Sequence, residues 1–302
     1  MAKGNTADVR PAIDAALVGR LVGSQFPRWA GLALEPLLPG GSDHVIYRLG
    51  TELTVRIPRH AGAIGQAAKE SVWLPRLAPH LPLAVPVPVA VGEPAFGYPW
   101  PWAVSRWLDG EVATVDALGD SSAAAVELAE FLTALWGYDP GAVPADPAGA
   151  GLSAGSLADR DRDTRAAVAR IAREGGPFDP AAMTELWDAA LAAPAWPGPP
   201  VWFHGDFHTG NVLMSRGRPG AVIDFGDLGV GDPARDLIIA FTLMSAGSRA
   251  AFRTALGVDD ATWTRGRGWA LATGLNAYSA YAAGNPRVAA QTTRQITRAL
   301  TG

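Results

Sequence analysis

The chain has 302 residues, of which 48% are hydrophobic and 18% are charged, as in an ordinary globular protein. This length is sufficient for one large domain or for two lobes. The net charge of −4 gives no general attraction to nucleic acid or to an anionic membrane. Cysteine is absent, which excludes disulfides and thiolate metal sites and fits a reducing cytoplasm.

No targeting or membrane segment is indicated. Residues 1–20 lack the uninterrupted apolar core of a signal peptide. No apolar stretch of about 18 residues is free of Pro and Gly, so we expect no membrane span. We therefore expect a cytoplasmic protein without nucleic-acid or membrane partners, and the sequence does not indicate its oligomeric state.

The first third of the chain is expected to be mainly strand. Apolar residues at helical spacing predict one helix over 8–26, with Asp8 as its N-cap. Strands are predicted near residues 32–38, 44–49, 52–58, 87–91 and 102–107. The Gly-rich turn between the first two strands contains Ser42 and could present its hydroxyl and backbone N–H groups to a phosphate. A plain β-turn explains this stretch equally well.

A candidate ion pair lies in the same region. Alternation along the third strand places its apolar side chains on one face and Arg56 on the other. Residues 62–74 predict a helix in which Glu70 lies near the apolar face, where it could orient Arg56. An exposed Arg on an edge strand is the alternative. Lys69 points away from that face and is expected on the surface, and Pro75 should break or kink the helix.

The rest of the chain is expected to be mainly helical. Amphipathic spacing predicts a helix over 121–136, capped by Asp120 or Ser121. Further helices are predicted over 157–174 and within 249–302, where two begin after Asp259-Asp260 and after Asn285-Pro286. The Gly-, Pro- and Ala-rich stretch 139–156 is expected to be a loop.

The most specific motif lies in residues 201–236. It contains His204-Gly205-Asp206, then Asn211 five residues after Asp206, and then Asp224-Phe225-Gly226. Apolar runs flank these groups and predict short buried strands with polar residues at their ends. The turn at 216–220 joins two of these strands.

The residue types and spacing of this motif indicate a chemistry. A carboxylate at a strand end can accept the proton of an alcohol, and an Asn amide with a second carboxylate can hold Mg²⁺. Protein kinases use an Asp as base, followed by an Asn and an Asp-Phe-Gly that bind the metal ions. We therefore predict Asp206 as the base and Asn211 and Asp224 as Mg²⁺ ligands. Asp and Asn also form turns, but this order and spacing are hard to obtain by chance.

Gly205 replaces the Arg of the eukaryotic kinase motif. Together with the Gly-Asp-Pro and Asp-Leu that follow, this makes the segment resemble the aminoglycoside phosphotransferase family of small-molecule kinases. The resemblance is strongest over 200–245 and extends more weakly over 38–110. It implies an α+β, bilobal, protein-kinase-like fold with a small β-rich N-terminal lobe and a larger, mainly α-helical C-terminal lobe. The nucleotide-binding lobe would span 1–105, the hinge 106–110, and the catalytic and substrate-binding lobe 111–302.

The resemblance also implies ATP and Mg²⁺ as cofactors and a small hydroxyl compound as substrate. Backbone groups of the hinge residues Arg106, Trp107 and Leu108 would bind adenine. A cation at the position of Arg56 would hold the inner phosphates; the family predicts Lys there, although Arg also binds phosphate well.

Four residues are expected to support the site. In the resembled family an Asp at the position of Asp236 braces the loop that carries the base, whereas helix-dipole complementarity is its alternative role. His208 could touch phosphate or substrate, but a hydrogen bond that stabilises the loop explains it better. His204 and Asp227 complete this supporting set. Asp232, followed by Pro, is expected to be a structural N-cap.

The substrate implied by the resemblance is an aminoglycoside-type antibiotic. Aminoglycosides are polycations, and related phosphotransferases resemble one another in lining the substrate cleft with carboxylates. Residues 249–302, however, contain seven Arg against Asp259 and Asp260, and most of these Arg are expected to face solvent. This balance leaves a neutral or anionic acceptor open, such as a macrolide, a sugar, an amino alcohol or a small metabolite. The cluster Asn276, Tyr278 and Tyr281 could bind such a ligand, and helix packing explains it equally well.

A nucleotide-binding pseudokinase that acts as a regulator is the alternative of a different class. Arg56 and the imperfect Gly-rich turn favour it, whereas the complete set of Asp206, Asn211 and Asp224 opposes it. A protein-substrate kinase is disfavoured because no Ala-Pro-Glu follows Asp224-Phe225-Gly226.

Overall fold

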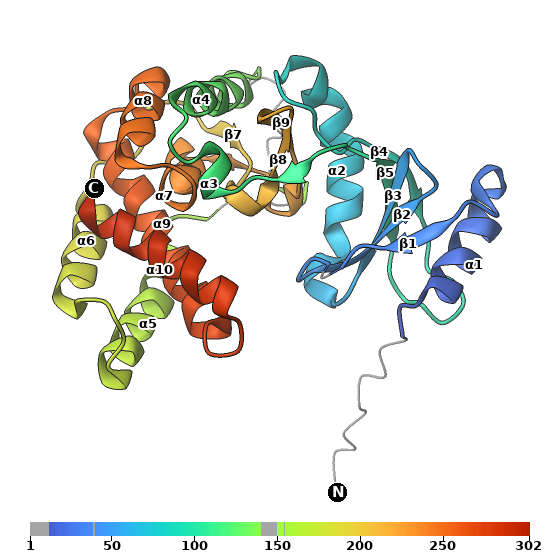
Figure 1. Ribbon diagram of the computed structural model, residues 1–302, viewed down its shortest axis with the longest axis horizontal. Coiled ribbons are helices and arrows are strands. Elements are labelled where there is room, and N and C mark those ends of the chain that lie inside the picture. The colour runs from blue at the N-terminus through green and yellow to red at the C-terminus, as the bar shows by residue number, and fades with distance from the viewer. Residues whose placement is uncertain (1–11, 39, 140–149, 154) are drawn as a thin grey trace, which may run out of the picture. The chain divides into compact units, whose positions relative to one another are not determined.

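The computed structural model describes residues 12–38, 40–139, 150–153 and 155–302. The chain forms two compact units, each described by itself: one reaches Arg76 and includes Pro86–Leu108, and the other contains Leu77–Val85 and Asp109–Gly302. The first is mainly sheet and the second mainly helix, so the predicted α+β fold class is confirmed (Figure 1). The segment Leu77–Val85 lies inside the lobe expected over 1–105 but belongs to the second unit.

The first unit is built on a five-stranded antiparallel sheet with the order β1-β2-β3-β5-β4. Its strands are β1 (Leu34–Pro36), β2 (His44–Leu49), β3 (Leu53–Pro58), β4 (Pro88–Gly92) and β5 (Trp102–Arg106). Each predicted strand is therefore present. The helix expected over 8–26 begins only at Ala15, as α1 (Ala15–Gln25), because Asp14 caps it by accepting a hydrogen bond from Leu17 N–H. Asp8 lies outside the described residues.

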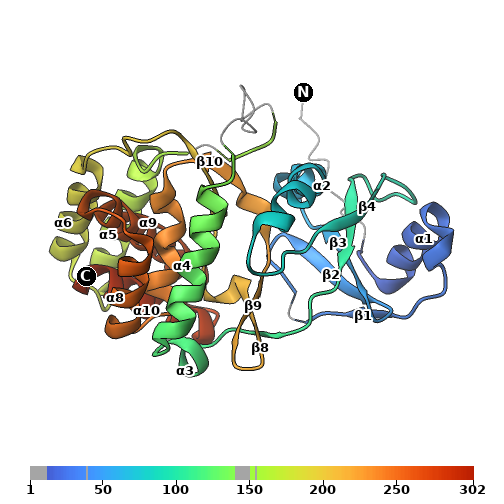
Figure 2. The same cartoon turned by 90° about the horizontal axis from the view of Figure 1, so that it is seen from above.

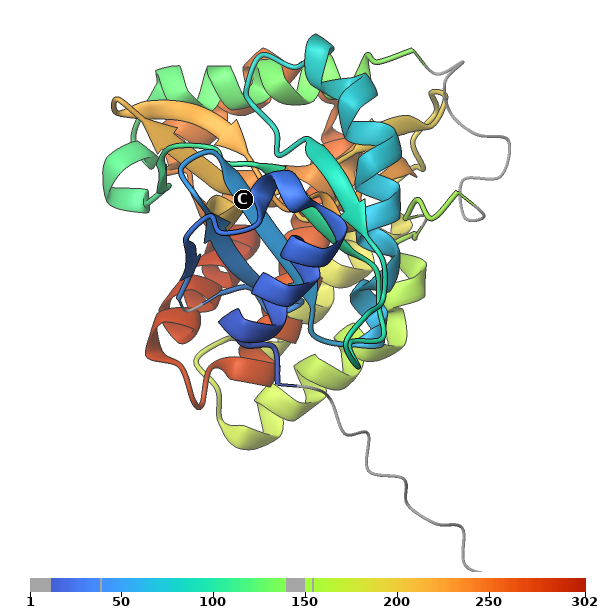
Figure 3. The ribbon, with the colours of Figure 1, turned by 90° about the vertical axis from the view of Figure 1, so that its right-hand side faces the viewer.

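The two faces of this sheet differ. One face is apolar and packs with α1, which lies across it in Figure 3; its buried members include Leu17, Leu21, Val55, Ile57 and Val104. The opposite face carries polar groups, because Thr54 and Arg56 alternate with Val55 and Ile57 along β3 and Arg48 pairs with Thr54.

Helix α2 (Ile64–Leu77), which follows a 3₁₀ turn at Ala61–Ala63, differs from expectation in two places. Pro75, which is expected to break or kink the helix, does not break it, because the helix continues to Leu77. Lys69 is not on the surface: its residue is only 7% exposed. The helix buries a second row of side chains, Lys69 and Trp73, beside the row that contains Glu70 and Leu74.

The second unit contains eight helices among its described residues (Figure 2). They are α3 (Val115–Leu118), α4 (Ser122–Trp136), α5 (Asp161–Glu174), α6 (Pro180–Ala192), α7 (Ile238–Thr242), α8 (Ala246–Leu256), α9 (Asp260–Tyr281) and α10 (Pro286–Thr301). Ser121, one of the two predicted caps, is the N-cap of α4. The two predicted C-terminal helices are present and begin one residue earlier than expected, with Asp259 and Asn285 as N-caps of α9 and α10. In the described part of the chain no helix combines the length and the apolar character that a bilayer span requires.

Short strands of the second unit frame the predicted motif. β7 (Val201–Phe203) pairs antiparallel with β10 (Gly229–Gly231). β8 (Val212–Ser215) lies between β6 (Glu111–Val112) and β9 (Arg218–Val222). Arg216 and Gly217, both at positive φ, form the tight turn between β8 and β9. The loop 204–211 therefore runs from β7 to β8, and Asp224 follows β9.

The seven arginines of residues 249–302 do not mostly face solvent, so this expectation is wrong. Only Arg287 is exposed, and Arg249 and Arg265 are buried. Arg267 donates to the carbonyl groups of Ala299 and Leu300 in the last turn of α10. These guanidinium groups join α8, α9 and α10, because long side chains can bury their stems while satisfying helix-end carbonyls.

Candidate functional site

The loop 204–211 is anchored by Asp236, which is fully buried in the 3₁₀ turn Pro233–Leu237. Its Oδ2 accepts a hydrogen bond from His204 N–H at 3.0 Å, and its Oδ1 accepts one from Gly205 N–H at 2.9 Å. Trp136 Nε1 donates to Oδ2 at 3.3 Å. Burial raises the pKa of the Asp236 carboxyl, and the electrostatic interaction with His204 and these three hydrogen bonds partly offset the rise. The contacts match the bracing position expected for this residue.

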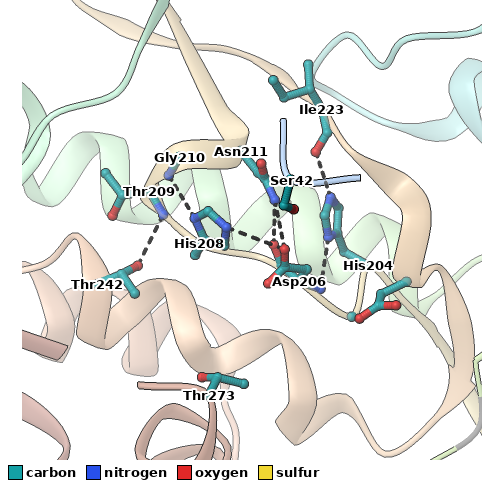
Figure 4. Close-up of polar contacts among 12 residues, drawn as sticks. Ser42, His204, Asp206, His208, Thr209, Gly210, Asn211, Ile223, Thr242 and Thr273 are labelled. Carbon is teal, nitrogen blue, oxygen red and sulfur yellow. Dashed lines mark hydrogen bonds and ion pairs between the residues drawn. The ribbon is translucent and has the colours of Figure 1, made fainter. Parts of the chain in front are cut away.

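The buried imidazole of His204 connects the loop to the end of β9 (Figure 4). Asp206 N–H donates to His204 Nδ1 at 3.2 Å, so the ring proton resides on Nε2. Nε2 lies 3.0 Å from the carbonyl oxygen of Ile223, to which it donates. Because Ile223 directly precedes Asp224, one side chain ties the predicted base to the predicted metal ligand.

Gly205 allows the loop to approach the segment after Asp224. Its φ is +88°, and a Cβ atom at this position would lie 2.3 Å from the carbonyl oxygen of Asp227. Any other residue would be strained and would collide with this backbone. The glycine that replaces the kinase Arg is thus required by local packing.

The carboxylate of Asp206 lies at the centre of the loop, with one oxygen bound and the other open (Figure 4). Its Oδ2 is 3.4 Å from His208 Nε2 and 3.4 Å from Asn211 Nδ2. His208 is itself oriented, because its Nδ1 accepts a hydrogen bond from Gly210 N–H at 2.9 Å. Within the described residues, Oδ1 of Asp206 accepts no hydrogen bond. The arrangement therefore presents Oδ1 to an incoming donor.

The charges around Asp206 keep it ionised. Burial by itself raises the pKa of Asp206, but the electrostatic interaction and hydrogen bond with His208, and then the electrostatic interactions with His204 and Arg235, lower it to about 2. Burial lowers the pKa of His208, whereas Asp206 and then Asp224 raise it, and the net shift is upward.

Asn211 and Asp224 are placed by the β8–β9 hairpin. Val212 pairs with Val222, and Ile223 N–H donates to the carbonyl oxygen of Asn211 at 2.9 Å. Asn211 Nδ2 donates to the Asp206 carbonyl at 2.9 Å, so its Oδ1 is directed elsewhere. Asp224 has φ +65° and ψ +68°, a left-handed conformation that Asp tolerates.

These two side chains fit a magnesium site with few protein ligands. An amide oxygen and a carboxylate are the hard donors that Mg²⁺ prefers, and the ion usually keeps waters and phosphate oxygens as its other ligands. Among the residues that the structure describes, no group of three or more His, Asp or Glu could hold a metal by itself. Two such donors would leave the other ligand positions of the ion to water or phosphate oxygens.

The remaining predicted site residues belong to the first unit. Arg56 Nη1 lies 2.9 Å from Oε1 and 2.7 Å from Oε2 of Glu70, and the two side chains are 11% and 1% exposed. Ser42 is exposed, and its Oγ donates to Asp43 Oδ1 at 3.2 Å. The ion pair expected between β3 and α2 is thus present.

The three expected hinge residues differ in their backbone hydrogen bonds. Arg106 N–H donates to the Val87 carbonyl at 3.2 Å, and Trp107 N–H donates to the Glu52 carbonyl at 2.7 Å. Within the described part of the chain, the N–H group of Leu108 makes no such bond. Of the three expected hinge residues, Leu108 is therefore the one whose N–H group can donate a hydrogen bond to a ligand.

Sequence reasoning missed Arg235, which lies in the site as a buried cation. Its Nε donates to the Gly205 carbonyl, and its Nη2 is 3.2 Å from Asp227 Oδ2. The position of Arg235 next to Asp236 could have indicated a role in the site. The burial of Arg235, however, depends on aromatic residues that are distant in sequence.

Residues 35–269 match the family sequence model of the phosphotransferase enzyme family, and this range contains every predicted site residue. The chain belongs to this family. The protein is thus a phosphotransferase, and the resemblance of its motif is confirmed. None of the curated proteins matches the chain.

Solved structures of phosphotransferases share this fold. The GDP complex of wild-type aminoglycoside 2'-phosphotransferase-IIIa is 19% identical, with a TM-score of 0.70, covering 95% of this chain and 98% of that one. The macrolide 2'-phosphotransferase MphH from Brachybacterium faecium is 24% identical, with a TM-score of 0.62 and coverages of 93% and 97%. Macrolide 2'-phosphotransferase type I is 21% identical, with a TM-score of 0.63 and coverages of 98% and 99%.

Proposed function

We propose that this phosphotransferase moves the γ-phosphate of ATP, bound with Mg²⁺, to a hydroxyl group of a small molecule. Asp206 Oδ1 would accept a hydrogen bond from the acceptor hydroxyl and direct its oxygen toward the γ-phosphorus. The new O–P bond forms as the bond to the β–γ bridging oxygen breaks, so that ADP leaves. The hydroxyl proton passes to Asp206.

The observation that carries this proposal is the asymmetry of the Asp206 carboxylate, with Oδ2 held by His208 and Asn211 and Oδ1 open. A carboxylate whose pKa is about 2 is a weak base. Its first contribution is therefore orientation of the hydroxyl, and the proton moves late, after most of the bond to phosphorus has formed. This order suits the loose transition state of phosphoryl transfer, in which positioning and charge neutralisation dominate.

The predicted site residues would bind the nucleotide and its metal ion. Asn211 and Asp224 would hold Mg²⁺, which when bound neutralises charge on the β- and γ-phosphates. Arg56, oriented by Glu70, would bind the inner phosphates, with Ser42 and its Gly-rich turn beside them, and Leu108 N–H would bind adenine. Solved relatives with GDP and with ADP support nucleotide use by this fold.

We propose a small antibiotic as the acceptor, and two classes are supported. Solved relatives include complexes with kanamycin and with gentamicin, which supports an aminoglycoside. The macrolide alternative is supported by two macrolide phosphotransferases and by one feature of this chain. Asp259 and Asp260, the acidic residues of 249–302, already serve as the N-cap of α9 and as the partner of Arg253, which reduces their attraction for an ammonium group.

The test is release of ADP from Mg-ATP with aminoglycosides, macrolides, sugars and amino alcohols, with the phosphorylated product identified by mass. Asp206→Ala should lower kcat by about 10²- to 10⁴-fold, the usual loss when a general base is removed. Asp116→Ala, at an exposed position of α3, is the control and should retain activity. Full turnover by Asp206→Ala would exclude the proposed mechanism. Nucleotide binding without turnover on the whole panel would instead favour the pseudokinase.

A further inference from the structure

Arg235 is a charged side chain that the proposed reaction does not use directly. It is only 5% exposed and lies next to Asp236 in the turn Pro233–Leu237. Its guanidinium carbon is 4.9 Å from the ring centre of Phe203 and 5.1 Å from that of Trp269. The cation is therefore held between the end of β7 and the middle of α9.

The two hydrogen-bonding ends of this guanidinium reach different segments of the site. Nε donates to the carbonyl oxygen of Gly205, and Nη2 donates to Oδ2 of Asp227, each at 3.2 Å. Gly205 precedes the base Asp206, and Asp227 follows the metal ligand Asp224 by three residues. One side chain thus bridges the loop of the base to the segment after the metal ligand.

Arg235 and Asp236 act on the same residue from opposite sides. Asp236 accepts the N–H group of Gly205, and Arg235 donates to its carbonyl group. Both peptide groups of the glycine are held by consecutive residues of one turn. Gly205 lacks a Cβ atom and has wide conformational freedom, so the two hydrogen bonds hold its backbone at φ +88°.

Packing alone does not account for a cation at this place. Burying a guanidinium costs free energy, and apolar replacements of buried ionic groups are often neutral or stabilising. Its main carboxylate partner, Asp227, is 51% exposed, so the ion pair is partly screened. The aromatic faces and the Gly205 carbonyl instead hold the charge near Asp206.

We propose that Arg235 is a positioning residue whose charge and planar fork lock the Asp206 loop onto the Asp224–Asp227 segment during phosphoryl transfer. This inference rests on the proposed function of Asp206 and Asp224. A loss of this clamp would let the base and the metal ligand drift relative to each other. A displacement of about 1 Å can lower a rate by about 10²-fold.

The experiment is chemical rescue of Arg235→Ala. We expect kcat to fall about 10- to 100-fold while KM for ATP stays within about twofold, since Arg235 itself is not among the residues proposed to contact the nucleotide. Millimolar guanidinium should restore at least part of kcat, whereas urea, which has the same planar shape without the charge, should not. Equal rescue by urea, or an unchanged kcat in the variant, would overturn the inference.

Two further variants keep the test decisive. Arg235→Met fills the space between the rings, so it should fold as stably as the wild type and still lose kcat; retention of full kcat would overturn the proposal. Arg249→Ala removes an equally buried arginine that contacts Phe241 and Gly302 rather than the loop. Arg249→Ala should lower the stability of the protein. Guanidinium should not selectively restore kcat in this variant.

Hydrogen exchange separates this inference from the proposed function. In Arg235→Met, amides in 203–211 and 224–231 should both exchange faster than in the wild type, while α8 and α10 stay unchanged. This readout is independent of turnover, so it tests the clamp even if the wild type transfers phosphate to no tested acceptor. Unchanged exchange in both segments would show that Arg235 does not join them.

Discussion

One nitrogen of Arg56 contacts both carboxylate oxygens of Glu70, at 2.9 and 2.7 Å, and so joins β3 to α2. The pair is buried, which makes its orientation well defined. The family resemblance predicts Lys at position 56, and the structure shows that Arg can occupy the place with the partner expected for it. The charge, rather than the exact side chain, is then what a phosphate would require.

Replacement of Arg56 with Met should therefore raise KM for ATP by about 10- to 100-fold, the effect of losing a hydrogen bond to a charged group. Arg56→Lys should stay within about threefold of the wild type because it retains a cation. Initial rates at varied ATP concentration measure both variants. Equal KM values for Met and Lys would show that the cation does not contact the nucleotide.

Asp236→Asn should lower both stability and kcat. The amide presents N–H groups to one of the two backbone donors of His204 and Gly205, leaving a buried donor unsatisfied at a cost of about 1–3 kcal/mol. Urea unfolding and kcat report the two effects. Trp136→Phe is the matched control, since it removes only the third donor and leaves both loop contacts; an equal loss in that variant would contradict the bracing role.

Gly205→Ala tests the close approach of the loop to Asp227. Left-handed backbone alone costs an L-residue about 1–2 kcal/mol, and the contact of Cβ with the Asp227 carbonyl adds to this cost. Gly217→Ala is the control, because Gly217 has φ +75° but nothing lies within 4 Å of its Cβ position. Thermal and urea unfolding should show a larger loss of stability for Gly205→Ala than for Gly217→Ala. Equal losses of stability would mean that the loop moves away from Asp227 at no cost in free energy.

His44 should make stability depend on pH. Burial first, and then the charge of Arg56, lower the pKa of His44 from its ordinary 6.5 to about 3. The folded state therefore keeps His44 neutral, whereas the unfolded state binds a proton as the pH falls below 6.5. Its contribution to stability is complete above pH 6.5 and is lost progressively toward pH 3, by about 2 kcal/mol at pH 5.

His44→Leu removes this titration. Urea unfolding at pH 5 and pH 7 should show a difference in stability that is about 2 kcal/mol smaller in the variant than in the wild type. His60→Leu is the control, because His60 is part-exposed beside Asp43. A pH dependence that is the same in wild type and His44→Leu would show that His44 titrates as it does in the unfolded chain.

The features that could be predicted from sequence are the local ones. Alternation indicated the strands of the first unit, and Asp259 and Asn285 marked helix starts by their capping chemistry. The order of Asp206, Asn211 and Asp224 identified the family. Helix α6 was not predicted, although Asp179 caps it and Pro180 opens it, because its alanine-rich face shows little contrast.

The features that could not be predicted depend on burial by distant parts of the chain. Lys69 is buried although it lies next to Glu70 in the helix and is predicted to point away from the apolar face. The arginines of residues 249–302 are bound to helix ends instead of solvent, and Arg235 is enclosed by Phe203 and Trp269. Which oxygen of Asp206 stays without a hydrogen bond, Oδ1 rather than Oδ2, depends on the side-chain orientations of His208 and Asn211. Sequence spacing contains no information about such orientations.

In the β8–β9 hairpin, the distance in space between Asn211 and Asp224 does not depend on the number of residues that connect them. Asn211 and Asp224 stand at its open end, and ladder pairing beside them sets their separation, while Arg216 and Gly217 form the far tip. Lengthening the tip adds chain without altering the pairing at the base. The hairpin tip is consequently a place to graft a reporter peptide or a surface tether while leaving Asn211 and Asp224 where they are.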